Sequence, residues 1–502
     1  MRSDNVPVIF GLKLKQYREE RGYNLKVLSQ KAGLSPSYLN EIEKGKKYPK
    51  TDKILQIAAA LDVPYDELVS LKLGKDLNPL ESILDSPVIR ELPLQLFGIS
   101  QQDVIQLFTK APTKAAALIR TVDEITRSYG MQVEHFFYAM LRSYQETRGN
   151  YFEDIEDAVQ EFVTSHGWLQ PMAIGYQQLA QVLAQQFNVV IDGNTIDDYP
   201  HLQGFRSIWV EGSPHVLLIN SKLSTEQKIF QMGRELGYRL LGLKERGITS
   251  SRAEVTSFEQ VLNDFKASYF AGAMLIGRES LVADMEEFFQ RERWDGEAFL
   301  AIKQRYGVTP EMFLYRLTQI IPHHFHFDKY YFLRFSNPAG SQRYHLTKQF
   351  NMSPVLFPTG IEQTEHYCRR WLAVDILREL DDHQQRGVDH PPIAGAQVSH
   401  FINGENDYFV ISLARPLALT PRTNTSVTLG FQITEEFEAK VKFWNDPAVP
   451  HKLINETCER CTLAAHACSE RVAPPQPEKQ PEYQDPRKSA LKSFLAEYKG
   501  PR

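Results

Sequence analysis

Residues 28–49 read LSQKAGLSPSYLNEIEKGKKYP, and this stretch decides the fold of the N-terminal part of the chain. Its beginning completes a short amphipathic helix predicted over Leu25–Ala32. Gly33 then opens a three-residue turn, because glycine adopts positive φ without steric cost. Ser35 is the predicted N-cap of the next helix, Pro36–Lys44, whose proline occupies the tolerated first position. Two short helices joined by such a turn indicate a helix-turn-helix.

The helix predicted over Pro36–Lys44 has two different faces. Leu39 and Ile42 point inward, while the opposite face carries Ser37, Tyr38, Asn40 and Glu41. A polar face of this kind is typical of a helix that reads DNA in the major groove. Helices predicted over 10–21, 54–61 and 65–69 complete a five-helix, all-α domain spanning residues 8–70.

The quoted stretch resembles the Cro/C1-type (XRE) helix-turn-helix family over about 60 residues. The resemblance implies that Ser37, Tyr38, Asn40 and Glu41 face base edges. It also implies that Asn24, Lys46 and Lys47 contact phosphates of a double-stranded DNA operator. The alternative is that this small helical domain is an adaptor that contacts protein.

Bulk composition limits the remaining possibilities. A chain of 502 residues is too long for one core and suggests three or four domains. It has no apolar run near the roughly 18 residues of a membrane span and no N-terminal signal, so we expect a soluble, cytoplasmic protein with no membrane partner. The formal net charge is −5, yet the first 70 residues hold 12 Lys and Arg against 9 Asp and Glu. Basic character is therefore local to the N-terminal domain.

The next segment, residues 71–164, is predicted as a helical linker and dimerisation region. Residues 71–95 lack sustained periodicity, whereas 114–162 carry apolar residues at three- and four-residue steps. These apolar residues can pack within one subunit or form the seam of a homodimer. Helix-turn-helix proteins commonly read paired half-sites as symmetric dimers, which makes the seam an open alternative.

A second resemblance covers residues 165–320, which we expect to form an α+β domain. The run FQMGRELGYRLL at 230–241 and its surroundings are similar to the IrrE/ImmA-like metallopeptidase family, in which this helix carries H-E-x-x-H. Here Arg234 and Tyr238 replace the two histidines, and only Glu235 remains. A glutamate alone cannot assemble the three-ligand zinc site that activates water. We therefore predict a non-catalytic scaffold, with Glu235 as an ion-pair or helix-surface residue; the alternative is a peptidase or antirepressor.

All four cysteines of the chain fall in a third region, 321–475, predicted as an α+β sensor domain built on an antiparallel sheet flanked by helices. Cys368 lies in HYCRRW, and Cys458, Cys461 and Cys468 lie in TCERCTLAAHACSERVAPP. Thiols in a reducing compartment favour a metal or a cluster over disulfides. From spacing alone, an iron–sulfur cluster, a structural zinc ion and unligated buried thiols all remain open. His466, between two of these cysteines, is interpreted as a surface residue.

The order of these parts resembles the short-chain fatty acyl-CoA regulator family as far as about residue 475. The resemblance implies that Cys368, Cys458, Cys461 and Cys468 ligate a [4Fe–4S] cluster. It also implies an acyl-CoA or CoA effector and regulation of central carbon metabolism. Arg343, Arg369 and Arg370 could meet CoA phosphates, although surface ion pairs are the simpler interpretation.

These expectations describe a multidomain transcription regulator and not an enzyme. The helix-turn-helix provides the output, and the C-terminal half senses a metabolite, the redox or iron state, or both. Residues 476–502 are expected to be a disordered tail with a short helix over 489–498. The operator sequence and the sign of regulation do not follow from the chain.

Overall fold

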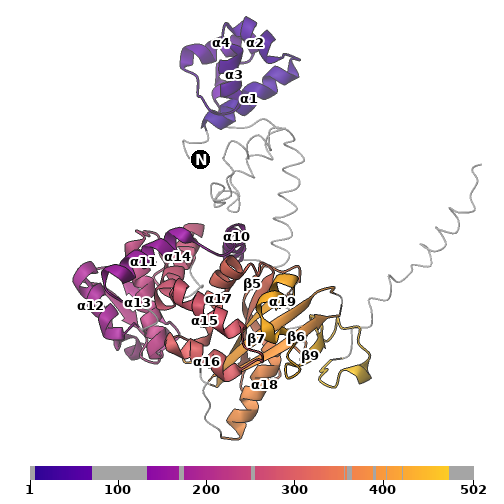
Figure 1. Ribbon diagram of the computed structural model, residues 1–502. Helices are drawn as coiled ribbons and strands as arrows, with labels where there is room; N and C mark the ends of the chain where they lie inside the picture. The colour runs from indigo at the N-terminus through magenta and orange to yellow at the C-terminus, as the bar shows by residue number, and fades with distance from the viewer. Residues whose placement is uncertain are drawn as a thin grey trace, which may run out of the picture. The chain divides into compact units, whose positions relative to one another are not determined.

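The structure is a computed structural model that describes residues 6–70, 133–168, 174–249, 255–355, 357–358, 365–387, 392–402, 404–420 and 422–473. The chain divides into two compact units, one containing the N-terminal domain and one containing most of the chain from Gln145 onward. Figure 1 shows both units.

The N-terminal domain consists of five helices. They are α1 (Val6–Glu20), α2 (Leu25–Ala32), α3 (Pro36–Glu43), α4 (Thr51–Leu61) and α5 (Tyr65–Val69). The Asn24 side chain caps α2 by accepting from the Val27 N–H at 2.9 Å, and Ser35 caps α3 by accepting from the Tyr38 N–H at 3.2 Å. Gly33 ends α2 with φ 65°. Both caps and the turn glycine therefore lie where the sequence predicts them, while α1 begins earlier and α3 ends one residue earlier than expected.

Two contacts fix α3 against α1. A Cβ on Gly11 would lie 2.2 Å from the Ile42 carbonyl oxygen, so the two helices approach backbone to backbone. The buried guanidinium of Arg18 donates to both Glu43 carboxylate oxygens, at 2.6 and 3.0 Å, and to the Tyr23 carbonyl at 2.8 Å. These contacts set the direction in which α3 presents its outer face.

Helices and a small sheet follow in the chain; residues 133–144 and 255–261 belong to the first unit, and the rest belong to the second. The helices are α10 (Val133–Thr147), α11 (Glu153–Ser165), α12 (Tyr176–Phe187), α13 (Thr225–Leu240), α14 (Phe258–Leu275), α15 (Arg278–Phe289), α16 (Gly296–Arg305) and α17 (Pro310–Phe325). The strands are β1 (Val189–Asp192), β2 (Ser207–Val210) and β3 (His215–Ile219), in the order β1-β3-β2 with η3 (Thr195–Asp198) and η4 (Pro200–Leu202) between β1 and β2. β1 and β3 run parallel, and β2 is antiparallel to β3.

A six-stranded sheet follows, in the order β5-β4-β8-β7-β6-β9. Its strands are β4 (Tyr330–Pro338), β5 (His345–Asn351), β6 (Ile393–Phe401), β7 (Asp407–Pro416), β8 (Thr423–Gln432) and β9 (His451–Ile454). The short helices between and after them are α18 (Leu372–Gln385), α19 (Glu435–Lys440), η6 (Lys442–Asn445) and η7 (Ala465–Ala467). All pairs are antiparallel except β6 with β9, which is parallel. The sheet is therefore mixed at one edge, because a crossing connection through α19 and η6 brings β9 back beside β6.

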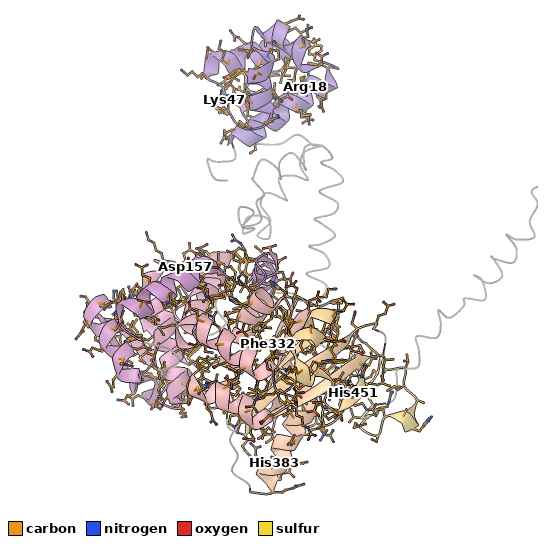
Figure 2. All side chains as sticks on the ribbon, viewed as in Figure 1. Arg18, Lys47, Asp157, Phe332, His383 and His451 are labelled. Carbon is orange, nitrogen blue, oxygen red and sulfur yellow. The ribbon has the colours of Figure 1, made fainter. Side chains whose placement is uncertain are left out.

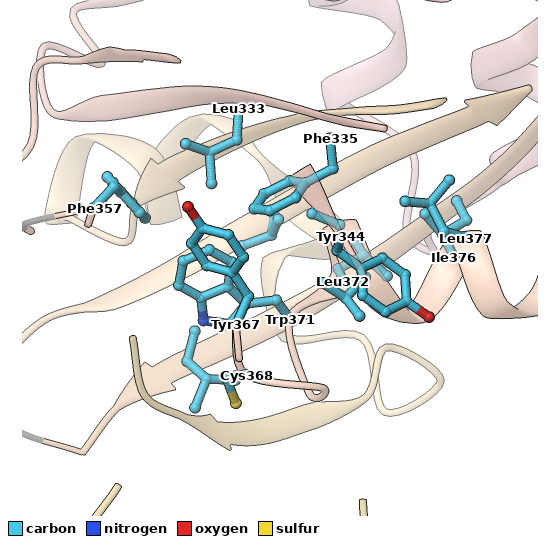
Figure 3. Close-up of a cluster of buried hydrophobic side chains, with 14 of the residues drawn as sticks. Leu333, Phe335, Tyr344, Phe357, Tyr367, Cys368, Trp371, Leu372, Ile376 and Leu377 are labelled. Atoms are coloured by element: carbon cyan, nitrogen blue, oxygen red, sulfur yellow. The ribbon is translucent and has the colours of Figure 1, made fainter. Parts of the chain in front are cut away.

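Both faces of this sheet are covered by helices. Tyr331 and Leu333 of β4 belong to the buried cluster that also contains Val374 and Leu377 of α18 (Figure 3). Phe332, between them, points to the other face, where its ring centroid lies 5.3 Å from that of Tyr315 of α17. Figure 2 labels Phe332 within this packed region. Successive residues of a strand point to opposite faces of the sheet, and both faces are buried. The strands therefore have nearly continuous apolar sequences.

The multidomain fold class, with an all-α helix-turn-helix followed by helical and α+β regions, is confirmed. Of the predicted dimer seam, Phe137, Met140, Leu141 and Tyr144 are buried within the single chain, which favours core packing for these four. The linker at 71–95, the first part of the helical segment, the tail and its helix at 489–498 lie outside the described residues. No described helix is both long enough and apolar enough to cross a bilayer.

Candidate nucleic-acid interface, residual peptidase pocket and cysteine site

The outer face of α3 presents the residues predicted to read bases. Ser37 is exposed, and Tyr38, Asn40 and Glu41 are half-buried, whereas Leu39 and Ile42 on the inner face are fully buried. α3 thus has one face in the core and one polar face toward solvent. The side chains available on that face include an amide, which can pair with adenine, and a carboxylate, which can accept from cytosine.

The predicted phosphate contacts lie around this helix. Lys46 and Lys47 are exposed just after α3, and Asn24 is exposed at the start of α2. Figure 2 shows Lys47 on the surface of the N-terminal domain. Without DNA, the Lys47 ammonium pairs with Glu41 at 2.7 Å, and the hydrogen bond from Lys47 lowers the pKa of Glu41. This surface pair is weak enough to exchange for a phosphate.

The residual peptidase motif on α13 is occupied by ion pairs. Glu235 is 1% exposed, and its two oxygens accept from Arg239 at 2.9 Å and from Arg246 at 2.6 Å. Arg234 donates to Asp264 and to Gln231, and the Tyr238 hydroxyl donates to Asp264 at 3.3 Å. Glu235 is thus a buried ion-pair residue and not a helix-surface residue, and its carboxylate is engaged on both oxygens instead of being free to act as a general base.

A short antiparallel pairing that sequence spacing did not indicate brings Cys368 and Cys458 to neighbouring strands. Tyr367 bridges Thr457, the Cys458 N–H donates to the His366 carbonyl at 2.8 Å, and the Cys368 N–H donates to the Glu456 carbonyl at 3.3 Å. Side chains alternate along paired strands, so Cys368 and Cys458 project to the same face. The Cys461 N–H turns back onto the Cys458 carbonyl at 3.4 Å.

Arginines hold this loop in place. Arg471 donates to the carbonyls of Cys458 at 2.9 Å and Leu463 at 2.8 Å. Arg370 donates to the Ala467 carbonyl at 3.0 Å and pairs with Glu470 at 3.1 Å. Of the arginines considered for CoA phosphates, Arg370 is therefore used in an ion pair, and Arg369 donates to the Gln342 carbonyl at 2.6 Å.

All four thiols are free and buried, each between 5% and 8% exposed. Cys368 lies at the edge of the buried cluster of Figure 3, beside Tyr367 and Trp371. Burial raises the pKa of Cys368 to about 11, and the neighbouring thiols of Cys458 and Cys461 add to this effect. His466 is exposed, as a surface residue should be.

The thiols meet two requirements of a metal or cluster site, sulfur donors and a nearby positive charge, but not the third, a coordination geometry. They supply four buried sulfur donors, and Arg370 lies close enough to Cys368 and Cys468 to stabilise the thiolate forms that a metal or cluster requires. However, no three His, Cys, Asp or Glu side chains among the described residues are arranged to hold a metal ion. The donor set therefore fits by type and proximity, while coordination geometry would have to form on binding.

Several residues of these sites were missed by sequence reasoning. Arg246, Asp264 and Trp209 join the motif on α13 only through the fold, and Arg471 ties the cysteine loop from its C-terminal side. None carries a local spacing signal, since their partners lie far along the chain. In the sequence, only the arginines and the glutamate of α13 indicated that this helix could form buried ion pairs.

Comparisons with known proteins match two of these parts to family models. The helix-turn-helix family model matches residues 14–68, and the IrrE N-terminal-like domain model matches residues 195–318. The HTH-type transcriptional regulator RamB of Mycobacterium tuberculosis is 23% identical over 326 residues, which cover 62% of this chain; the chain spans 65% of the length of RamB. The HTH-type transcriptional regulator SinR of Bacillus licheniformis is 37% identical over 79 residues, covering 16% of this chain and 68% of SinR. A solved structure described as a Mycobacterium tuberculosis transcriptional regulator is 20% identical and covers 68% of this chain and 94% of its own, with a TM-score of 0.46.

Fold and sites together define a helix-turn-helix protein whose N-terminal domain is followed in the sequence by a modified peptidase-like domain. The particular family follows from the sequence matches: the chain belongs to the XRE-type helix-turn-helix regulators and carries an IrrE-like domain.

Proposed function

We propose that this protein is a sequence-specific DNA-binding transcription regulator. The observation that carries the proposal is the polar outer face of α3, held toward solvent by two side-chain caps and the Arg18–Glu43 ion pair. RamB and SinR, to which the chain is similar, are named transcriptional regulators. The Arg234 and Tyr238 substitutions, with Glu235 engaged by two arginines, support a non-catalytic role for the IrrE-like domain.

The test is binding of the intact chain to fragments of its own promoter region. Sequence-selective retardation that weakens steeply with salt is expected, because phosphate contacts release counterions. Equal affinity for unrelated DNA, or no binding at low salt, would favour the adaptor function instead. Chelator-sensitive cleavage of a partner protein would favour the peptidase. A genome-wide binding map from aerobic and anaerobic cells would give the target genes and the redox response together.

The C-terminal half is proposed to be the sensor. Cys368, Cys458, Cys461 and Cys468 would hold a [4Fe–4S] cluster, which supplies a centre sensitive to oxygen and redox state when bound. The burial of all four thiols, with Arg370 beside Cys368 and Cys468 to offset negative charge, supports this proposal. Zinc remains the competing ligand because it accepts the same four sulfurs.

Elemental analysis distinguishes the two. Anaerobically purified protein is expected to be brown and to contain iron and sulfide in equal amounts, and Cys461→Ser should remove the colour while Ser469→Ala, on the same loop, should not. Colourless wild-type protein with one zinc per chain would replace the cluster by a structural zinc site.

The effector is proposed to be an anionic metabolite of the acyl-CoA class. A cleft lined by Arg206, Arg334 and Arg415 also contains Glu311, whose single negative charge leaves an excess of positive charge there. The apolar side chains of Leu413 and Leu417 lie in the same cleft, a combination that suits an anionic group and a short acyl chain. Calorimetry with acetyl-CoA and propionyl-CoA tests the proposal. Arg415→Gln should weaken binding, whereas the same change at the distant Arg460 should not; equal affinities would exclude this cleft.

A further inference from the structure

The pocket beside the residual peptidase motif on α13 is lined by the buried Arg234, the half-buried Arg246 and one tryptophan, Trp209. It is small and partly open, and it lies between α13, β2 and the segment 246–249. The indole of Trp209 is flanked by the guanidinium carbons of Arg246 at 4.3 Å and Arg239 at 4.7 Å from the ring centre. The Trp209 N–H of the main chain donates to the Ile248 carbonyl at 2.8 Å, which holds that segment over the pocket.

Several N–H donors in this place are left without an acceptor. Trp209 Nε1, Arg234 Nε, Arg239 Nη2 and Arg246 Nε are buried and have no hydrogen-bond partner among the described residues. Trp209 is 6% and Arg234 is 8% exposed, so bulk water does not solvate them freely. An unsatisfied buried donor is costly, and three of these four, on Trp209, Arg234 and Arg246, line the same pocket, which favours a ligand with acceptor oxygens there.

The charges of the pocket point the same way. Three guanidinium groups, those of Arg234, Arg239 and Arg246, face two carboxylates, Glu235 and Asp264. Glu235 already accepts from two arginines, and the Asp264 side chain is 49% exposed. The surroundings are therefore cationic, with donors and no unused buried carboxylate, which disfavours a cation and favours an anion.

We propose that this pocket binds a small oxyanion, a carboxylate or a phosphate, in place of the metal ion of a peptidase. The anion would accept from Trp209 Nε1 and from the free Nε groups of Arg234 and Arg246. The proposal is independent of DNA binding and of the cleft near Arg415, because it is measured on the intact chain without DNA and through different residues.

Titration with sodium acetate and with sodium phosphate, at ionic strength held constant with sodium chloride, tests the proposal. Calorimetry should show saturable binding of at least one anion, and tryptophan fluorescence should change with it. Which of the two binds distinguishes the carboxylate from the phosphate. Trp209→Phe keeps the ring between the two arginines and removes one donor, so it should weaken binding about ten-fold and abolish the fluorescence change.

Two further variants complete the design. Arg246→Lys keeps the positive charge and an ion pair with Glu235 but loses the Nε donor, so it too should weaken binding. Trp168→Phe changes a tryptophan outside the pocket and should bind as the wild type does, with its fluorescence change intact. Circular dichroism and thermal unfolding identify any variant that fails to fold. If folded wild-type protein shows no saturable binding of either anion, or if Trp209→Phe and Trp168→Phe bind equally, the proposal is wrong and ordered water satisfies these donors.

Discussion

Gly11 is the residue at which α1 and α3 touch through their backbones. Gly11→Ala should destabilise the helix-turn-helix by about 1–3 kcal/mol, because the added Cβ would lie 2.2 Å from the Ile42 carbonyl oxygen and force the helices apart. Hydrogen-exchange mass spectrometry of the intact chain should detect this destabilisation as faster amide exchange in α3. Gly272→Ala is the control: nothing lies within 4 Å of its Cβ, so helix propensity alone should make it neutral or mildly stabilising. Unchanged exchange in Gly11→Ala would contradict the close approach.

The outer face of α3 and the lysines that follow it should contribute to DNA binding in different ways. Asn40→Ala should weaken the free energy of binding to the preferred operator by about 1–3 kcal/mol and reduce the preference for that sequence, because the amide can pair only with particular base edges. Lys46→Gln should weaken binding to all DNA sequences equally. It should also reduce the slope of log affinity against log salt concentration by about one unit. Fluorescence anisotropy over a range of salt measures both effects. Lys53→Gln on α4 is a control lysine; if it behaved like Lys46→Gln, the phosphate assignment would be wrong.

At the scale of elements, α11 and α17 are joined by a buried ion pair. Arg316 is 1% and Glu156 is 4% exposed, with two contacts of 2.6 and 2.9 Å, and the Tyr269 hydroxyl of α14 also donates to Glu156 at 2.7 Å. Glu156→Gln should lower the free energy of unfolding by about 3–5 kcal/mol, because it leaves the Arg316 charge buried without a counter-ion. Urea unfolding measures this change.

Two variants separate charge pairing from packing at this joint. The double variant Glu156→Leu with Arg316→Met should lose far less stability than Glu156→Gln, since no buried charge remains. Glu153 lies on α11, as Glu156 does, and forms a more exposed pair with Arg278 of α15. Glu153→Gln breaks that pair and should lower the free energy of unfolding by less than about 1 kcal/mol. Equal losses for Glu153→Gln and Glu156→Gln would mean that burial does not control the energy of these pairs.

Glu311 of α17 joins the helix to strands β4 and β5 through Arg334 at 3.3 Å and Lys348 at 3.7 Å. Burial alone would raise the pKa of Glu311, but Arg334, Lys348 and two further arginines lower it to about 2. The folded-state pKa is thus below the unfolded value, so the stabilisation is present above the unfolded pKa and lost as pH falls toward 2.

Glu311→Gln should therefore cost about 2 kcal/mol at neutral pH, a value reduced for the partial exposure of the carboxylate. Its cost should shrink as pH falls below about 4.5, which thermal unfolding between pH 7 and pH 3.5 can follow. Glu286→Gln, exposed on α15, should show no such trend. A pH-independent cost for Glu311→Gln would show that its charge is not what stabilises this joint.

At the scale of the whole molecule, the proposed operator readout requires two DNA-reading heads, since one α3 covers a single half-site. Light scattering coupled to gel filtration should give twice the chain mass of 57.7 kDa, and the preferred operator should contain two related half-sites. A monomer at concentrations that saturate the operator would contradict the symmetric dimer and restrict recognition to one half-site.

The sequence by itself determined what depends on neighbours along the chain. Asn24, Gly33, Ser35 and the alternation of α3 are local signals, and caps and turns form between residues three apart. The loss of both metal-ligand histidines on α13 was equally readable, because ligands at i and i+4 share one helix face.

Only the tertiary structure decided the rest. It joined Cys368 to Cys458 through a pairing across about ninety residues, and it brought Trp209, Arg246 and Asp264 to the motif on α13. It also returned β9 to lie parallel to β6. Such contacts are set by how strands pair and helices cover a sheet, so no local spacing encodes them. The packing of distant segments therefore brings Cys368 to the C-terminal cysteine loop. It also forms the cationic pocket around the α13 residues that replace the peptidase motif.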